Sequence, residues 1–267
     1  TLSNALENAK AAGIKVFAYE KLGLLEEIES DIAHILSSRT DLSDDRLSHT
    51  EATATLLRID AEIKQNTDRL ESAEQLTLKA LGILGDAEDR EKTKTFAQLA
   101  EIQLDLEKPD AALESATSAV KLFQADEDEW DAGSAAFAYH LSLQLGQLEK
   151  FEEAERLMRQ ALDYNQNFYG NSHPESMSVK GSLVYLCMRM DKHEEADVLA
   201  EELIASLASF DVESDEFERM CEVVMDAFVA VKFDRGHKPQ EVEQMANRYF
   251  SHISDEKFHI TITDGED

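Results

Sequence analysis

The stretch KFEEAERLMRQAL at residues 150–162 decides the fold, because the chain contains two further copies of its pattern. One is KPDAALESATSAV at residues 108–120, and the other is KHEEADVLAEELI at residues 192–204. Each copy has an Ala at its fifth position, and small or apolar residues follow it four, seven and eight positions later. This spacing places the apolar residues on one face of an α-helix. The three alanines, at intervals of 42 residues, are Ala112, Ala154 and Ala196.

A second helical pattern precedes each copy, so each unit is predicted to be a helix, a short turn and a second helix. Its apolar residues are Phe96, Leu99 and Ala100, then Ala138, Leu141 and Leu145, then Leu183, Val184 and Cys187. The repeats are clear at 50–210 and degenerate at 1–40 and 214–252. One pair cannot bury its apolar face alone, so neighbouring pairs are expected to stack. This predicts an all-α solenoid of about five to six antiparallel helix pairs in a single domain over 1–252.

The composition excludes several classes of protein. Of the 267 residues, 56 are acidic and 26 are basic, so the formal net charge is −30. Nucleic acids and anionic membrane surfaces both require a clustered excess of Lys and Arg, so neither partner is expected. With 10 Gly and 3 Pro, the chain has too few turn residues for an all-β fold. The excess of acid favours a basic partner, although adaptation to a salt-rich host explains the same charge equally well.

The sequence contains no recognisable motif for catalysis, cofactor binding or metal binding. Gly82 and Gly85 lack the Lys-Ser or Lys-Thr that follows a phosphate-binding glycine loop. Cys187 and Cys221 have no paired ligand nearby in the sequence, which argues against zinc and favours core thiols in a reducing compartment. No apolar run is long enough for membrane insertion. We therefore expect a cytoplasmic protein that is not an enzyme and uses neither a cofactor nor a metal.

The repeats resemble tetratricopeptide repeats (TPRs), and residues 151–162 are most similar to the second helix of that family. The spacing is longer than the 34 residues usual in the family. It resembles the kinesin-light-chain subgroup, whose extra linker is similar to residues 169–175 here. The sequence departs from the family in lacking the Trp of the first helix. The resemblance implies a right-handed superhelix whose first helices line a concave groove.

The resemblance also implies which residues face a partner in that groove. Gln98, His140 and Ser182 occupy the position that commonly holds a peptide-clasping Asn in the subgroup, and each can hydrogen-bond a peptide group. Tyr139 and Tyr185 would be aromatic anchors. The other expected groove residues are Lys94, Glu101, Asp105, Leu143, Gln147, Ser178 and Arg189.

These features predict a non-catalytic scaffold or adaptor that holds a peptide or a helix of a partner protein. The alternative is a ligand- or peptide-responsive regulatory module of a larger signalling protein or complex. Self-association through the end repeats is also open, since weakly capped repeats leave apolar ends. Two segments break the pattern. The acidic segment 124–131 around Trp130 is either a solvated turn or a docking motif. The acidic tail 253–267 contains a short period-two stretch at 258–263 that is typical of a strand.

Overall fold

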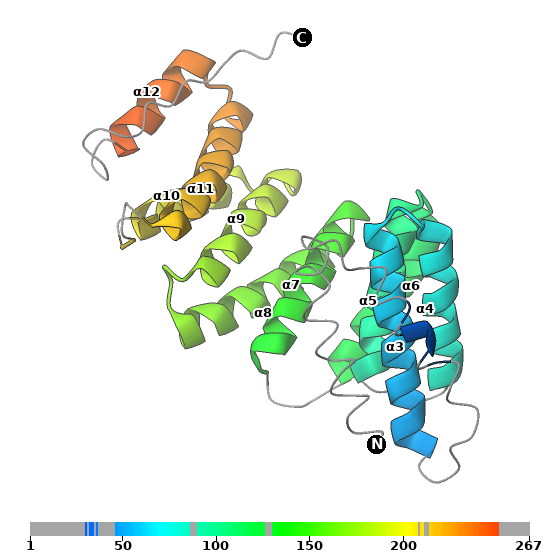
Figure 1. The fold of residues 1–267 in the computed structure, drawn as a ribbon. Coiled ribbons are helices and arrows are strands. Elements are labelled where there is room, and N and C mark those ends of the chain that lie inside the picture. Colours follow the sequence, from blue (N-terminus) through cyan, green and yellow to red (C-terminus); the bar gives the residue numbers. More distant parts are fainter. Residues whose placement is uncertain are drawn as a thin grey trace. The chain divides into compact units, whose positions relative to one another are not determined.

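The computed structural model describes residues 30, 32–34, 36, 46–85, 90–125, 130–207, 209–210 and 214–250. These residues form α-helices and no strand (Figure 1). The predicted tail at 253–267 and most of the predicted repeat at 1–40 lie outside them. The ten main helices of the described part are α3 (Arg46–Asn66), α4 (Leu70–Leu84), α5 (Arg90–Asp105), α6 (Pro109–Ala125), α7 (Ala132–Gln147), α8 (Phe151–Tyr169), α9 (Pro174–Arg189), α10 (His193–Leu207), α11 (Asp215–Asp234) and α12 (Pro239–Phe250).

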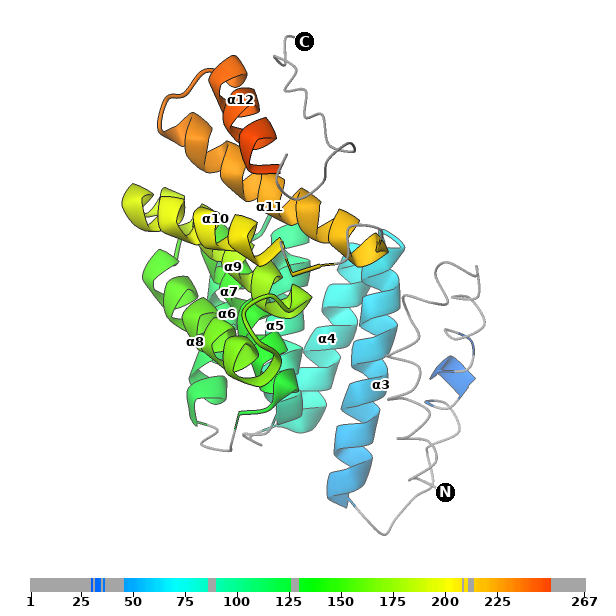
Figure 2. The ribbon, with the colours of Figure 1, turned by 90° about the vertical axis from the view of Figure 1, so that its left-hand side faces the viewer.

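These helices pack as five antiparallel pairs, from α3/α4 to α11/α12, which confirms the predicted all-α fold of helix pairs. They belong to two compact units that divide between Asp128 and Glu129. The first unit contains α3–α6 and the second contains α7–α12. In Figure 2, α3 and α4 run side by side in the first unit, and α11 and α12 form a helical hairpin in the second. The single solenoid over 1–252 stays a prediction.

The repeated alanine is buried at the same place in its helix each time. Ala112, Ala154 and Ala196 have no exposed surface, and each is the fourth residue of its helix, α6, α8 or α10. Ala73 takes the same place in α4, and Val242 takes it in α12. A small side chain at this position lets the second helix of the pair approach its neighbours closely, because packed cores tolerate little added volume.

The turn inside each of the first four pairs has one residue in the left-handed backbone conformation. These residues are Asp68, Glu107, Glu149 and Asp191, with φ between 57° and 59°. The next amide donates to the carbonyl oxygen five residues back, as in Lys108 N to Gln103 O and Lys192 N to Cys187 O, both at 2.8 Å. This is the Schellman helix ending, in which glycine is the usual left-handed residue. The fifth pair follows that rule with Gly236 at φ 80°.

The prolines begin helices as predicted: Pro109 begins α6, Pro174 begins α9 and Pro239 begins α12. A capping box with Ser172 as the N-cap of α9 is wrong. The cap is His173, whose Nδ1 accepts from the backbone N–H of Glu175 at 3.3 Å. Because proline at the first helical position has no N–H, the first amide that needs an acceptor lies two residues after His173.

Candidate functional site

The predicted groove residues lie on the first helices of three successive pairs. Lys94, Gln98, Glu101 and Asp105 are on α5 of the first unit. Tyr139, His140, Leu143 and Gln147 are on α7, and Ser178, Ser182, Tyr185 and Arg189 are on α9, both in the second unit. The structure therefore places them in two sets, one in each unit.

In the first unit, side chains of α5 are bound to α3. Gln98 Nε2 donates to the backbone carbonyl oxygen of Arg58 at 3.0 Å. Asp105 Oδ2 accepts from Gln65 Nε2 at 2.7 Å. Two of the four predicted residues on α5 are thus already engaged within the protein. The α3 partners were missed because the repeat pattern fades before residue 70, although their spacing of 40 residues from α5 could have indicated them.

The α3–α5 face carries excess negative charge with an unused acceptor. Glu91 lies 3.4 Å from Arg58 and 3.2 Å from Lys94. Burial raises the pKa of the Glu62 carboxyl, the charge of Arg58 opposes this, and the charge of Glu101 adds to it. Gln98 Oε1 is buried with no hydrogen-bond partner among the described residues. A donor such as a peptide N–H would satisfy that oxygen.

In the second unit, two predicted residues are brought together across neighbouring helices. The hydroxyl groups of Tyr139 on α7 and Ser182 on α9 are 2.8 Å apart and share a hydrogen bond. His140 is exposed beside Tyr139, with 5.5 Å between the ring centres. Leu143 is half-buried and Gln147 is exposed. The bond fixes the Tyr139 ring at the surface, next to an imidazole that is open to solvent.

Tyr185 continues this surface from α9 toward α11. Its side chain is 43% exposed, so it is not a core residue. Burial of its hydroxyl raises the pKa of Tyr185, and the negative charge of Asp226 on α11 raises it further. A Cβ at Gly181 would lie 2.9 Å from Val223 Cγ1, so glycine permits the close approach of α9 and α11. Asp226 was missed because the repeat is degenerate at 214–252.

Arg189 is engaged at the turn that precedes α8. Its guanidinium lies 3.5 Å from the Glu149 carboxylate and 5.0 Å from the centre of the Phe151 ring. Both partners belong to the preceding pair. We therefore rank Arg189 lowest among the predicted groove residues of the second unit.

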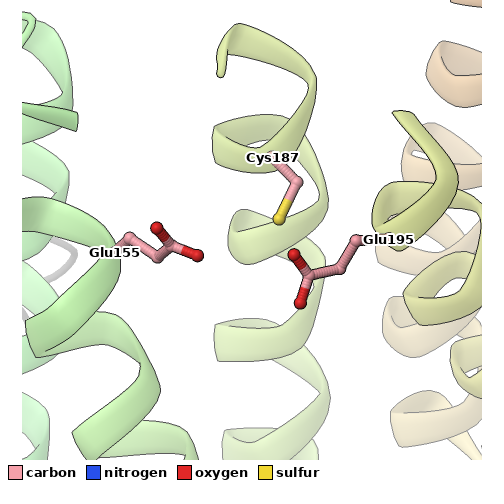
Figure 3. A group of neighbouring side chains, drawn as sticks. All are labelled: Glu155, Cys187 and Glu195. Atoms are coloured by element: carbon pink, nitrogen blue, oxygen red, sulfur yellow. The ribbon is translucent and has the colours of Figure 1, made fainter. Parts of the chain in front are cut away.

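Glu155, Cys187 and Glu195 form a group that resembles a metal-ligand set, with their ligand atoms within 4.8 Å of one another (Figure 3). Their bonding favours a structural role. Glu155 accepts from Lys192 at 2.6 Å and from Arg159 at 2.7 Å, and Arg159 also binds Glu195 at 2.6 Å. Burial raises the pKa of the Cys187 thiol to about 11. A metal would have to displace both cations and deprotonate the thiol.

Among the described residues, no helix is both long and apolar enough to cross a membrane.

The paired helices and the side-chain array along their first members define a TPR-like helical-repeat fold. Over its whole length the chain is similar to BtubC (BKLC) from P. vanneervenii, with 18% identity, 97% of that chain covered and a TM-score of 0.60. Over 76% of its length it is similar to a Podosopora anserina protein described as a kinesin light chain with nearly identical TPR-like repeats. There the identity is 16%, the coverage of that chain 97% and the TM-score 0.62.

A third similar structure is the apo form of RapI, with 14% identity, a TM-score of 0.50, and 92% of this chain and 91% of that chain covered. These likenesses establish the fold. No family model matches the sequence, and a search of curated proteins finds no match.

Proposed function

We propose that the chain is a non-catalytic scaffold or adaptor that binds an extended peptide or a helix of a partner protein. The observation that carries this proposal is the surface along α7 and α9, where Tyr139, His140, Ser182 and Tyr185 lie on neighbouring first helices. Hydroxyl and imidazole groups can bond the backbone of a ligand that leaves water, and tyrosine rings supply contact area at low entropic cost. The TPR-like fold supports the same proposal, since stacked repeats present such surfaces for binding.

Free thiols support a reducing compartment, and we place the protein in the cytoplasm on that basis. Cys187 and Cys221 are both unpaired and buried. Structural disulfides are rare in such a compartment and common in secreted proteins.

The test uses the purified full chain as bait in an extract of its host. The variant His140→Ala/Tyr185→Ala removes the exposed members of the surface and leaves the hydroxyl bond intact. The matched control is Arg156→Ala/Val198→Ala, which truncates two exposed residues of the second helices α8 and α10. Loss of an aromatic anchor typically weakens binding about tenfold or more.

We expect a captured protein to be lost with the His140/Tyr185 variant and retained with the control. Equal capture by wild type and both variants would contradict the proposal. Circular dichroism melting curves of the three proteins should coincide, which ensures that the comparison reports binding rather than folding.

A further inference from the structure

A second surface lies at the end of α8 and in the turn that follows it. The rings of Tyr164 and Phe168 stack with their centres 5.7 Å apart. Phe168 meets Tyr169 edge to face at 4.7 Å, and Tyr169 stacks on His173 at 4.4 Å. We call these four residues the aromatic cluster. α8 is the second helix of its pair, so the cluster does not belong to the first-helix surface of α7 and α9.

The cluster combines exposure with local order. Phe168 is 67% exposed and Tyr169 is 37% exposed, which is unusual for rings of this size. Hydrogen bonds hold the turn beneath them: Ser176 Oγ donates to Gly170 O at 2.8 Å, and His173 caps α9. A fixed aromatic surface loses little conformational entropy when it binds a ligand.

The charge around the aromatic cluster is negative. The sequence has no Lys or Arg between Arg159 and Lys180, whereas Asp163 and Glu175 are exposed acids within that interval. The two bracketing cations are already bound. Arg159 pairs with Glu155 and Glu195, and Lys180 is buried and pairs with Glu202 at 2.8 Å.

Elsewhere in the second unit, the protein covers aromatic rings with its own cations. Arg189 lies over Phe151 at 5.0 Å, and Lys232 lies over Phe228 at 5.3 Å, both measured to the ring centre. The exposed ring of Phe168 has no cation of its own segment to cover it. Aromatic faces attract Lys and Arg, and the attraction grows where carboxylates are close.

We propose that the aromatic cluster is a second interaction surface that binds a Lys- or Arg-containing segment of a partner protein. A cationic side chain of that segment covers the Phe168 ring, and Asp163 and Glu175 attract its neighbouring charges. The net charge of −30 steers such a segment toward the protein. This surface operates independently of the peptide-binding surface on α7 and α9.

The test is fluorescence anisotropy of a labelled, acetylated tetra-arginine amide with the full chain in 0.15 M salt. Phe168→Leu keeps the charge and the apolar character of the site but removes the ring. Its matched control is Phe233→Leu, which removes the exposed ring of α11 in the same way. We expect Phe168→Leu to weaken binding about two- to fivefold, as for an exposed cation–π contact, and Phe233→Leu to leave it unchanged.

Equal affinities of wild type and Phe168→Leu would overturn the proposal, as would equal weakening by both Phe variants. The His140→Ala/Tyr185→Ala protein should bind the arginine peptide as wild type does, so failure here is distinguishable from failure of the groove proposal. Sedimentation velocity supplies a further check. If Phe168→Leu abolished self-association and left peptide binding intact, the cluster would be a contact between copies of this chain instead.

Discussion

Four acidic residues adopt a backbone conformation that suits glycine better. Asp68, Glu107, Glu149 and Asp191 all have positive φ at the end of a first helix. The left-handed conformation costs a residue with a Cβ about 1–2 kcal/mol. Glycine avoids that cost but loses about 0.5–1 kcal/mol more entropy on folding. The sequence shows these positions only as polar turn residues, and their strain becomes visible from the backbone.

Replacing one of these residues by glycine should therefore stabilise the protein. We expect Glu107→Gly to raise the free energy of unfolding by about 0.5–1 kcal/mol, measured by urea denaturation. The matched control is Glu114→Gly in α6, which makes the same charge change at an exposed helical position and should cost about 1 kcal/mol. If both glycines destabilised equally, the turn would carry no strain.

The two thiols should be unreactive in the folded protein. Burial raises the pKa of both Cys187 and Cys221 to about 11, so almost no thiolate exists at pH 8. We expect neither to react with Ellman's reagent over minutes at pH 8, and both to react at once in denaturant. Rapid reaction of one thiol without denaturant would show local opening around its helix. The prediction of core thiols from the sequence is confirmed, since both are buried.

On the scale of the helices, ion pairs join one pair to the next. The fifth residue of three second helices is an acid: Glu74 in α4, Glu155 in α8 and Asp197 in α10. Each binds a lysine from the following pair, namely Lys108 at 2.7 Å, Lys192 at 2.6 Å and Lys232 at 2.6 Å. The sequence shows both members at their repeat positions. Their pairing depends on how neighbouring helices align, which the repeat period alone does not determine.

This ion pairing makes stability depend on pH. Burial alone would raise the pKa of Glu155, but the hydrogen bonds of Lys192 and Arg159 lower it below its usual 4.5. A carboxyl with a lowered pKa in the folded state stabilises it above the unfolded value and loses that effect as pH falls through the folded value. In Lys192→Met we expect a smaller loss of stability between about pH 5 and pH 3, followed by urea denaturation.

Lys150→Met is the control for this prediction. Lys150 occupies the same turn position one pair earlier, and it is exposed. Its pH profile should overlay that of wild type. Identical profiles for all three proteins would show that the Glu155 pair contributes nothing measurable, as is common for exposed ion pairs.

The sequence determined the helices better than it determined the site. Helix periodicity and the buried alanines follow from local spacing, so the helix pairs could be predicted. The roles of Gln98 and Arg189 could not, because each binds a residue of a neighbouring helix. Tyr139 and Ser182 were assigned to the same surface, and the bond between their hydroxyl groups requires the register of α7 against α9.

On the scale of the whole molecule, charge dominates. With 56 acids against 26 bases, carboxylates repel one another across the surface, and this repulsion opposes the compact state. Salt screens such repulsion over a Debye length of about 10 Å at 0.1 M. The ion pairs between helices are weakened by the same screening, but they involve far fewer charges than the surplus of acid.

We therefore expect the melting temperature to rise as sodium chloride increases from about 0.05 to 0.5 M. Differential scanning calorimetry measures this, with sucrose at matched osmolality as a control for exclusion from the surface. A fall in melting temperature with salt would mean that attractive pairs outweigh the surplus of acid.

The Schellman turns have a consequence for how the chain reaches its folded state. Each turn closes through bonds between residues only a few positions apart, so a helix pair assembles without waiting for distant segments. Folds dominated by such short-range contacts cross their barrier quickly. In repeat arrays the first ordered pair can arise anywhere and growth proceeds to its neighbours. A weakened end pair should accordingly fray first in hydrogen exchange while interior pairs stay protected.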